Sequence, residues 1–298
     1  MTRETIKEHF IALQNSIVLA LENADTKGKF KTDLWERSEG GGGITKVIEN
    51  GFVLEKGGVN FSAVYGSLSN NVAELLHVNP DSFFATGVSI VIHPNNPFVP
   101  IIHMNIRYFE LENGEYWFGG GIDLTPHYID EVQAKFFHKS IKAICDKFDS
   151  EFYLKFKTWA DSYFYITHRQ ETRGIGGIFF DRLNELNTQL TKERLFDFVM
   201  ELGHSFAPIY THLMQLNSNK EFSEANRRWQ LLRRGRYVEF NLIYDRGTRF
   251  GLETGGRIES ILMSLPLLAS WEYDVKVEPE SQESFTLNLL KQNIDWCN

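Results

Sequence analysis

The sequence predicts an α+β fold, in which one large, mainly antiparallel β-sheet is flanked by α-helices. Between residues 44 and 124, apolar residues tend to recur at every second position and turn signals interrupt them. On both sides of this region the apolar spacing changes to three and four, which is typical of helices. The chain has 298 residues, 42% of them hydrophobic, which is enough for a substantial core. We therefore expect a single domain over residues 1–298, with residues 1–39 forming an N-terminal helix and linker.

The first predicted element is a helix over residues 5–23. Its apolar residues lie four, three, four and four positions apart: Ile6, Phe10, Leu13, Ile17 and Leu21. Thr5 and Glu8 have the spacing of a capping box. The polar stretch 25–33 is predicted to be a linker, and a run of four glycines at 40–43 follows it.

Antiparallel strands are expected next, over residues 44–124. Turn signals stand at Asn50-Gly51, Gly57-Gly58 and Asn113-Gly114, and recurrent turns without long helices favour hairpins. Residues 128–166 return to helical spacing. A glycine-rich break at 173–177 then precedes a short strand over residues 178–181.

The C-terminal third is predicted to be mainly helical. Helices are expected over residues 191–217, with a kink at Pro208, and over residues 221–232. Alternation over residues 237–244 predicts a strand, and residues 260–269 predict a short buried helix that Pro266 interrupts.

Composition and charge limit the classes of function. The formal net charge of −8 and the isoelectric point near 5.6 argue against nonspecific nucleic-acid binding, so no nucleic-acid partner is expected. Cys145 and Cys297 have no metal-ligand spacing and favour a reducing compartment. Neither a secretory signal nor an apolar stretch of about 20 residues is apparent, so we expect a cytoplasmic protein without a transmembrane segment.

The stretch 101–109 is the most informative for chemistry. Alternation places Ile102, Met104, Ile106 and Tyr108 on one face of a strand, and His103, Asn105 and Arg107 on the other. A solvated sheet face is the simpler interpretation of this row. The alternative is a row of side chains that faces a ligand, in which Arg107 binds a carboxylate with two hydrogen bonds.

Two neighbouring strands favour the ligand interpretation. In residues 88–93, Ser89 and His93 share a face, so a second strand also presents a histidine and a small polar group. In residues 116–126, three glycines precede Asp123, and glycines in a strand mark a bulge or a close backbone approach. A two-residue turn at Asn113-Gly114 would send Asp123 to the opposite face, so we expect a bulge in the glycines that returns it to His103.

Other polar groups give weaker signals. His138 and His168, with His93 and His103, could form a cluster of four histidines, although the spacing matches no familiar metal motif. The basic run from 227 to 236 is typical of a solvated helix with a basic end. The segment 245–248 and the turn Gly255-Gly256-Arg257 would let backbone N–H groups and a guanidinium approach an anion.

Several long segments resemble the aerobic coproporphyrinogen III oxidase family. They are EKGGVNFSAVYG at 55–66, GVSIVIHPNNPFVPIIHMNIRYFE at 87–110, YWFGGGIDLTPHY at 116–128, YFYITHRQETRGIGGIFFD at 163–181 and RYVEFNLIYDRGTRFGLETGGRIESILMSLP at 236–266. The likeness runs in order from about residue 40 to residue 271. It implies that coproporphyrinogen III, a tetrapyrrole, loses two propionate carboxylates as carbon dioxide and becomes the divinyl protoporphyrinogen IX of haem biosynthesis. Molecular oxygen is then the co-substrate and hydrogen peroxide the expected co-product, with no cofactor required for the redox chemistry.

The resemblance also implies roles for residues. His103 would be the proton donor or general acid/base, and Asp123 would meet the pyrrole N–H groups. Substrate binding would fall to Ser89, Asn105, Ile106, Arg107, Asp245, Arg246, Gly255, Gly256 and Arg257. The four histidines 93, 103, 138 and 168 match positions assigned in bacterial members to a divalent metal such as manganese. Residues 237–272 match the family's dimer contact, so a homodimer is implied.

Three residues differ from the family pattern, and two other functions are considered for the chain. Lys46 follows the glycine run where family members commonly have a Ser-Arg pair, Arg182 stands where a second Asp is common, and Glu253 adds a negative charge close to the proposed anion turn. None of the three touches the core motifs. One rival is a tetrapyrrole-binding protein without catalysis, and the intact row of His103, Asp123 and Arg107 opposes it. Another is a histidine-ligated metal oxygenase that acts on a different anionic aromatic substrate.

Overall fold

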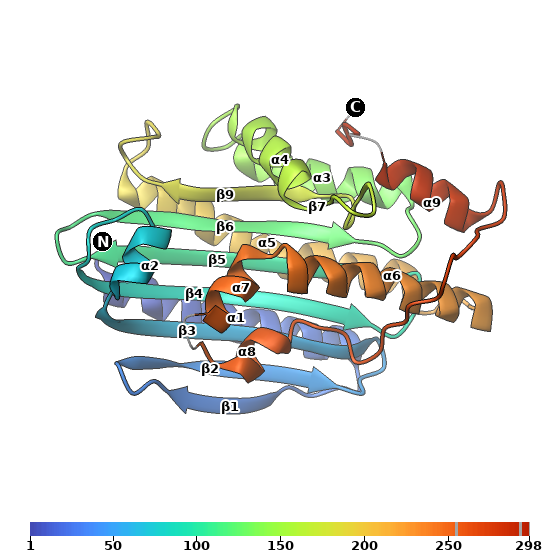
Figure 1. Cartoon of the computed structure of the whole chain (residues 1–298), viewed down its shortest axis with the longest axis horizontal. Helices are drawn as coiled ribbons and strands as arrows, with labels where there is room; N and C mark the ends of the chain where they lie inside the picture. Colours follow the sequence, from blue (N-terminus) through green and yellow to red (C-terminus); the bar gives the residue numbers. More distant parts are fainter. Residues whose placement is uncertain (254–255, 292–293, 298) are drawn as a thin grey trace.

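Seven strands form one sheet in the order β1-β2-β3-β4-β5-β6-β9, and every neighbouring pair is antiparallel (Figure 1). The computed structural model describes residues 1–253, 256–291 and 294–297. The strands of the sheet are β1 (Lys31–Glu36), β2 (Gly41–Glu49), β3 (Leu54–Ser67), β4 (Ser82–Pro94), β5 (Ile101–Leu111), β6 (Tyr116–Thr125) and β9 (Gly177–Leu183). A separate hairpin pairs β7 (Tyr165–Ile166) with β8 (Glu171–Thr172). The predicted α+β class and antiparallel sheet are confirmed.

Helices cover both faces of the sheet. Their bounds are α1 (Arg3–Asp25), α2 (Asn70–Leu75), α3 (Glu131–Cys145), α4 (Phe152–Tyr163), α5 (Lys192–Asn217), α6 (Glu224–Ile243), α7 (Arg246–Glu253), α8 (Ile258–Leu262) and α9 (Gln282–Leu290). In Figure 1, α1 and α5 lie behind the sheet, α2, α6, α7 and α8 lie in front of it, and α3 and α4 lie beside β9. The two faces of the sheet therefore differ in what covers them.

The main hydrophobic core lies between the sheet and the helices α1 and α5. The five apolar residues predicted for the first helix, from Ile6 to Leu21, are all almost completely buried in it. From the sheet, Ile102, Met104, Ile106 and Tyr108 face this core and have no exposed surface. Gly203 of α5 lets the helix approach β5 closely, because a Cβ there would come within 3.1 Å of Ile106. The opposite face of β5 is consequently left for polar side chains.

The N-terminal region differs from the prediction in two details. Helix α1 begins after Thr2, whose hydroxyl accepts the N–H of Thr5, so the predicted capping box at Thr5 and Glu8 is wrong. The predicted linker 25–33 is partly ordered structure, because β1 begins at Lys31. Asp25 is fully buried and accepts backbone N–H groups of residues 28 and 52–54, which ties the end of α1 to the β2–β3 turn.

Three further predictions are wrong. Gly57-Gly58 lies inside β3, where the absent side chain of Gly58 leaves the space that the sulfur of Met263 occupies. Residues 237–244 continue helix α6 to Ile243, because buried residues at 237, 240 and 241 also fit helical spacing. The segment 260–269 contains only the end of the short helix α8, none of whose residues is buried, and then the buried Met263.

Candidate active site

A row of polar side chains crosses the sheet on the face opposite the main core. In the strand register His103 pairs with Asp123, Asn105 pairs with Ser89 and Gly121, and Arg107 pairs with Gly87 and Gly119. Paired residues of antiparallel strands point to the same face, so these side chains share one surface. The predicted common face of His103, Asn105 and Arg107 is confirmed, and Ser89 of β4 shares it.

The register of the β5–β6 hairpin brings Asp123 to His103 directly. Leu111 and Glu115 close the hairpin through a backbone hydrogen bond, which leaves three residues in the loop. Gly114 has a φ of +88°, a conformation that favours glycine. The loop has one residue more than the expected two-residue turn. The predicted bulge between β5 and β6 is also wrong, because the register between these strands is regular. A register irregularity occurs instead on the other side of β6, against β9.

One end of the row is closed by a buried chain of charges. His103 Nδ1 lies 2.7 Å from Asp123 Oδ1, and Arg173 donates to Asp123 Oδ2 at 2.6 Å. Arg173 also donates to Asn241 of α6 at 2.8 Å. The side chains of Asp123 and Arg173 are each 3% exposed, whereas that of His103 is 24% exposed. Of His103, Asp123 and Arg173, only His103 thus has a side chain that is clearly exposed at the surface of the site.

Aromatic rings hold the guanidinium of Arg173 in place. Its central carbon lies 4.3 Å from the ring centre of Phe164 and 4.7 Å from those of Tyr237 and Phe240. Arg173 was not predicted as a site residue, because in the sequence it stands only at the start of a glycine-rich break. A signal was present, because a carboxylate in an otherwise apolar strand requires a cationic partner when it is buried.

Asp123 stays ionised in this setting. Burial alone would raise the pKa of Asp123, but the charge of Arg173 and the hydrogen bond from His103 outweigh burial and hold the pKa below its ordinary value. Both carboxylate oxygens have partners, one each. The neighbours of Asp123 are therefore His103 and Arg173, rather than an open space in which pyrrole N–H groups would meet it.

The other end of the row is open to solvent. Arg107 donates to Asn105 Oδ1 at 3.0 Å and to Asp181 Oδ1 of β9 at 2.9 Å. The side chains of Arg107 and Asp181 are 37% and 32% exposed. Gly119 lies beneath this pair, and a Cβ there would come within 2.5 Å of Asp181 Oδ1 and 2.7 Å of Arg107 Nε. The glycine thus lets a guanidinium and a carboxylate meet directly above the sheet.

Several other predicted binding residues lie elsewhere. The side chain of Ile106 faces the main core, so the prediction that it contacts a ligand is wrong for its side chain. Asp245 accepts the N–H of Thr248 in the first turn of α7 and the hydroxyl of Tyr163. The backbone N–H of Arg246 donates to the same hydroxyl, and its guanidinium lies 5.9 Å from the ring centre of Tyr163. Asp245 therefore organises the start of α7.

The described part of the predicted anion turn, Gly256 and Arg257, lies near the other edge of the sheet, where Arg257 meets β1. Gly255 lies outside the described residues, and the backbone N–H of Gly256 donates to the carbonyl of Gly251. Arg257 forms an ion pair with Asp33 of β1 and donates to Ser260 Oγ at 3.0 Å. The Ser260 hydroxyl also contacts that of Thr45, and the Ser260 backbone carbonyl accepts a hydrogen bond from Asn60 Nδ2, so α8 is attached to β2 and β3 on the face that carries His103.

The four histidines predicted as metal ligands have separate partners. His93 is buried, and its Nε2 lies 2.8 Å from the carbonyl of Ser264. His138 uses both ring nitrogens, one with Tyr153 and one with the carbonyl of Ile175. His168 contacts Glu239 and Tyr244. Within the described ranges, no group of three or more His, Cys, Asp or Glu could hold a metal ion, so these residues do not fit a shared metal.

Burial explains the electrostatics of two of these histidines. It lowers the pKa of His138 to about 3, and it holds the pKa of His93 well below the ordinary range with help from the charge of Arg234. Both are therefore neutral at physiological pH, with His138 anchoring the loop that follows Arg173. Their part in the site is structural support.

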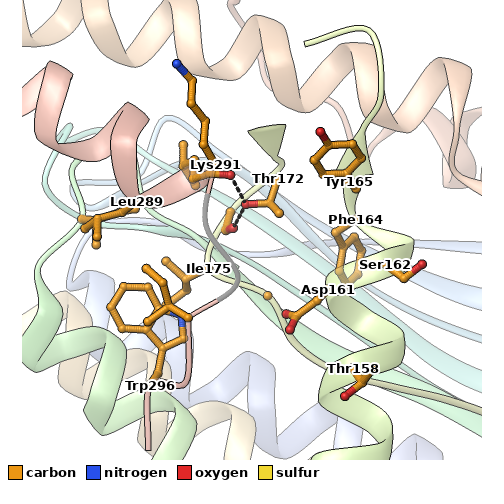
Figure 2. Close-up of a pocket in the computed structure, with 15 residues that line it drawn as sticks. Thr158, Asp161, Ser162, Phe164, Tyr165, Thr172, Ile175, Leu289, Lys291 and Trp296 are labelled. Carbon is orange, nitrogen blue, oxygen red and sulfur yellow. Dashed lines mark hydrogen bonds between the residues drawn. The ribbon is translucent and has the colours of Figure 1, made fainter. Parts of the chain in front are cut away.

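A cavity lies behind the loop that carries Arg173. Its volume is about 420 Å³, and its wall combines α4, the glycine-rich loop and the chain after α9 (Figure 2). Figure 2 shows Asp161, Phe164, Thr172, Ile175 and Trp296 around it. Phe164 also contacts Arg173, but no member of the row from His103 to Arg107 lines the cavity. It is separate from the polar row.

Comparison with known proteins gives consistent similarities over nearly the whole chain. A family model described as coproporphyrinogen III oxidase matches residues 5–296. An oxygen-dependent coproporphyrinogen-III oxidase of Drosophila melanogaster is 50% identical over 298 residues, which cover 95% of this chain and 75% of the fly protein. The chloroplastic coproporphyrinogen-III oxidase 1 of Arabidopsis thaliana is 49% identical, with 96% and 77% covered. An oxygen-dependent coproporphyrinogen-III oxidase of Prochlorococcus marinus (strain MIT 9312) is 43% identical, with 100% and 93% covered.

Proposed function

The chain belongs to the coproporphyrinogen III oxidase family, and from that premise we propose how its residues perform the reaction. The protein is an oxygen-dependent oxidoreductase that converts two propionates of coproporphyrinogen III to vinyl groups, giving protoporphyrinogen IX in haem biosynthesis. The observation that supports the assignment of roles is the polar row itself. It combines a histidine backed by a buried charge pair with an exposed arginine on one face of the sheet.

The stoichiometry of the reaction requires a proton at each step. One ionised propionate side chain, one O₂ and one proton give one vinyl group, one CO₂ and one H₂O₂. The substrate side chain loses two electrons and one proton, and oxygen gains two electrons and two protons, of which only one comes from the substrate. A site for this reaction therefore needs a group that delivers one proton for each propionate.

We assign that proton delivery to His103. Nδ1 donates to the carboxylate of Asp123, which leaves Nε2 as the ring nitrogen for proton transfer to the substrate side. The carboxylate of Asp123 holds the proton on Nδ1 and fixes the orientation of the imidazole ring. A histidine held in this way acts as a general acid with a defined direction of transfer.

Asp123 and Arg173 are proposed to position His103. Arg173 keeps Asp123 ionised, and Asp123 fixes the orientation of the imidazole ring. We propose this role in place of the direct contact between Asp123 and pyrrole N–H groups, because both oxygens of the carboxylate have protein partners and the side chain is almost completely buried.

Arg107, Asn105 and Ser89 form the proposed carboxylate-binding part of the row. A guanidinium can bind a propionate with two parallel hydrogen bonds, and the amide and hydroxyl provide further donors. A buried carboxylate without a cation would cost several kcal/mol, roughly, so a substrate with four carboxylates requires such groups. Arg257 is the proposed second cation, over β1 and β2.

Oxygen is the co-substrate, as the names of the relatives state. For a divalent metal such as manganese, the histidines at 93, 103, 138 and 168 do not fit, because each has other partners and His138 has neither nitrogen free. We propose no step that uses a metal. The reduced tetrapyrrole is electron-rich, so we propose that its oxidation needs no resident redox cofactor.

We further propose one domain, a homodimer and a cytoplasmic location. A single hydrophobic cluster includes residues from Ile6 to Trp296, which supports one domain over residues 1–298. Exposed apolar side chains between residues 237 and 272, among them Leu242, Ile243 and Trp271, support a dimer contact there. Cys145 and Cys297 are free, which suits a reducing compartment. The described helices include none that is long and apolar enough to cross a membrane.

Product analysis tests the proposed function. Purified protein is incubated with coproporphyrinogen III under air and under argon, and tetrapyrroles, CO₂ and H₂O₂ are measured. We expect two CO₂ and two H₂O₂ per protoporphyrinogen IX under air, and no turnover under argon. Tight binding without CO₂ release would support a non-catalytic binding protein. Loss of all activity after chelation, with recovery on adding metal, would support a metal oxygenase.

A further inference from the structure

We propose that Asp181 and Asp33 are internal substitutes for substrate carboxylates, each occupying an arginine of the binding face until a propionate displaces it. This inference rests on the proposed function, because it assumes that Arg107 and Arg257 bind propionates. It adds two residues that set substrate affinity, with an effect opposite in sign to that of the arginines themselves.

Both proposed propionate-binding arginines are already paired with an aspartate. Arg107 is 2.9 Å from Asp181, and Arg257 forms an ion pair with Asp33. The two aspartates come from strands β9 and β1, at opposite edges of the sheet. Two such pairs over one binding face suggest a common role.

The exposure of these pairs distinguishes them from the structural ion pairs. In both pairs each side chain is at least a quarter exposed, whereas the pair of Arg173 and Asp123 is almost completely buried. Exposed ion pairs contribute little to stability, because water and salt screen them and long side chains lose freedom when they pair. A competing carboxylate can therefore replace either aspartate at small cost.

The geometry places both arginines toward one stretch of the sheet. In the strand register Asp33 pairs with Thr45, Thr45 with Asn60, Asn60 with Ser89, and Ser89 with Asn105. This row leads from Asp33 to the residue that contacts Arg107, across four strand spacings, or about 19 Å. A macrocycle with propionates on different sides could therefore reach both arginines while it lies over β4, beside α8.

Competition of this kind has a measurable consequence. A substrate carboxylate must displace the aspartate, so the apparent affinity is lower than the intrinsic affinity of the arginine for a carboxylate. Replacing the aspartate with the isosteric, uncharged asparagine removes most of the competition. The free energy that an exposed ion pair contributes corresponds to about a two- to fivefold change in Kd.

The experiment measures the Kd of coproporphyrin III, the oxidised macrocycle that keeps all four propionates and is not turned over. The Asp181→Asn and Asp33→Asn variants should each bind it about two- to fivefold more tightly than the wild type. Glu36→Gln is the matched control for Asp33, because it removes a charge from the opposite face of the same strand. Asp197→Asn, from the exposed pair with Arg194, is the control for Asp181.

A double-mutant cycle separates the competition from a general effect of negative charge. In an Arg107→Ala background, Asp181→Asn should leave the Kd unchanged, because its partner is absent. Weaker binding by Asp181→Asn in the wild-type background would instead show that Asp181 positions Arg107, and would overturn the proposal. Tighter binding that persists without Arg107, or equal gains in the control variants, would also overturn it. Failure of the proposed function is a separate outcome, namely no CO₂ release by the wild type in air.

Discussion

The two ends of the polar row lie only four residues apart on β5, yet they differ in almost every physical property. At the end near His103, a carboxylate and a guanidinium are buried together and ringed by aromatic side chains. At the end near Arg107, a similar pair is about one third exposed and lies over a glycine. Burial thus decides whether a charge pair is a fixed support or an exchangeable contact.

The two ends suit the two tasks of the enzyme. Proton delivery requires a group in one fixed orientation, and a buried pair provides this because it is costly to disturb. Carboxylate binding requires a cation that can change partners, and an exposed pair permits the change. We therefore expect substitutions at the closed end to affect turnover and folding, and substitutions at the open end to affect substrate affinity.

The largest expected effect is the loss of turnover in His103→Asn. General acid catalysis is worth about 10²–10⁴ in rate, so kcat should fall by about that factor. KM should change little. The melting temperature should fall, but by less than in a variant that lacks Arg173, because the buried carboxylate of Asp123 loses one hydrogen bond and keeps its cation. Steady-state kinetics and thermal melts check this prediction. A fall in kcat of less than tenfold would remove His103 from the role of proton donor.

Arg173→Leu should give the largest loss of stability. It leaves the carboxylate of Asp123 buried without its cation, and breaking a buried pair in this way costs about 3–5 kcal/mol. Arg107→Leu is the matched control, and its free energy of unfolding should change by less than about 1 kcal/mol. Chemical denaturation of both variants measures the difference. Equal destabilisation would contradict the contrast between the two ends.

Arg107→Ala should mainly weaken substrate binding. A hydrogen bond to a charged group contributes about 1.5–3 kcal/mol, which corresponds to a rise in KM of roughly ten- to a hundredfold. We expect kcat to stay within about threefold of the wild type, because Arg107 does not contact His103 or Asp123. A variant with unchanged KM and greatly reduced kcat would place Arg107 at the reacting centre.

A smaller effect concerns the pH dependence of stability near the closed end. Burial lowers the pKa of His138 to about 3, so the unfolded chain binds a proton below about pH 6.5 that the folded chain excludes. This contribution to stability is full above that pH and is lost as the pH falls toward 3, by about 1.4 kcal/mol per pH unit. His138→Gln should therefore flatten the acid side of the stability curve.

The control for this measurement is His204→Gln, because His204 lies on the exposed surface of α5. Free energies of unfolding are measured by denaturant titration between pH 7 and pH 5. The difference in slope between the His138 variant and the wild type should be close to one proton. An unchanged slope would mean that His138 is protonated in the folded chain.

The sequence predicted the elements whose evidence is local. The apolar stripe from Ile6 to Leu21 identified α1, and the alternation of Ile102 to Arg107 identified both faces of β5, because helical and strand periods reflect burial directly. Residues 237–244 were assigned wrongly, since a short apolar run fits both periods and only its packing against β4 and β5 decides between them.

The composition of the site was less predictable than its location. His103 and Asp123 were placed together by means of a bulge between β5 and β6, whereas the structure uses a three-residue loop, which local sequence distinguishes poorly from a two-residue turn. Arg173 was missed because it lies 50 residues from Asp123 in the chain and only the fold brings them together. For the same reason, residue types alone could not tell that His138 and His168 have separate partners.

A crystal structure of the protein with coproporphyrin III bound would test the account most directly. We predict a propionate within hydrogen-bonding distance of Arg107, His103 Nε2 directed at the macrocycle, and an unbroken contact between Asp123 and Arg173. A macrocycle bound in the cavity behind the Arg173 loop, or on the α1 and α5 face of the sheet, would contradict the account.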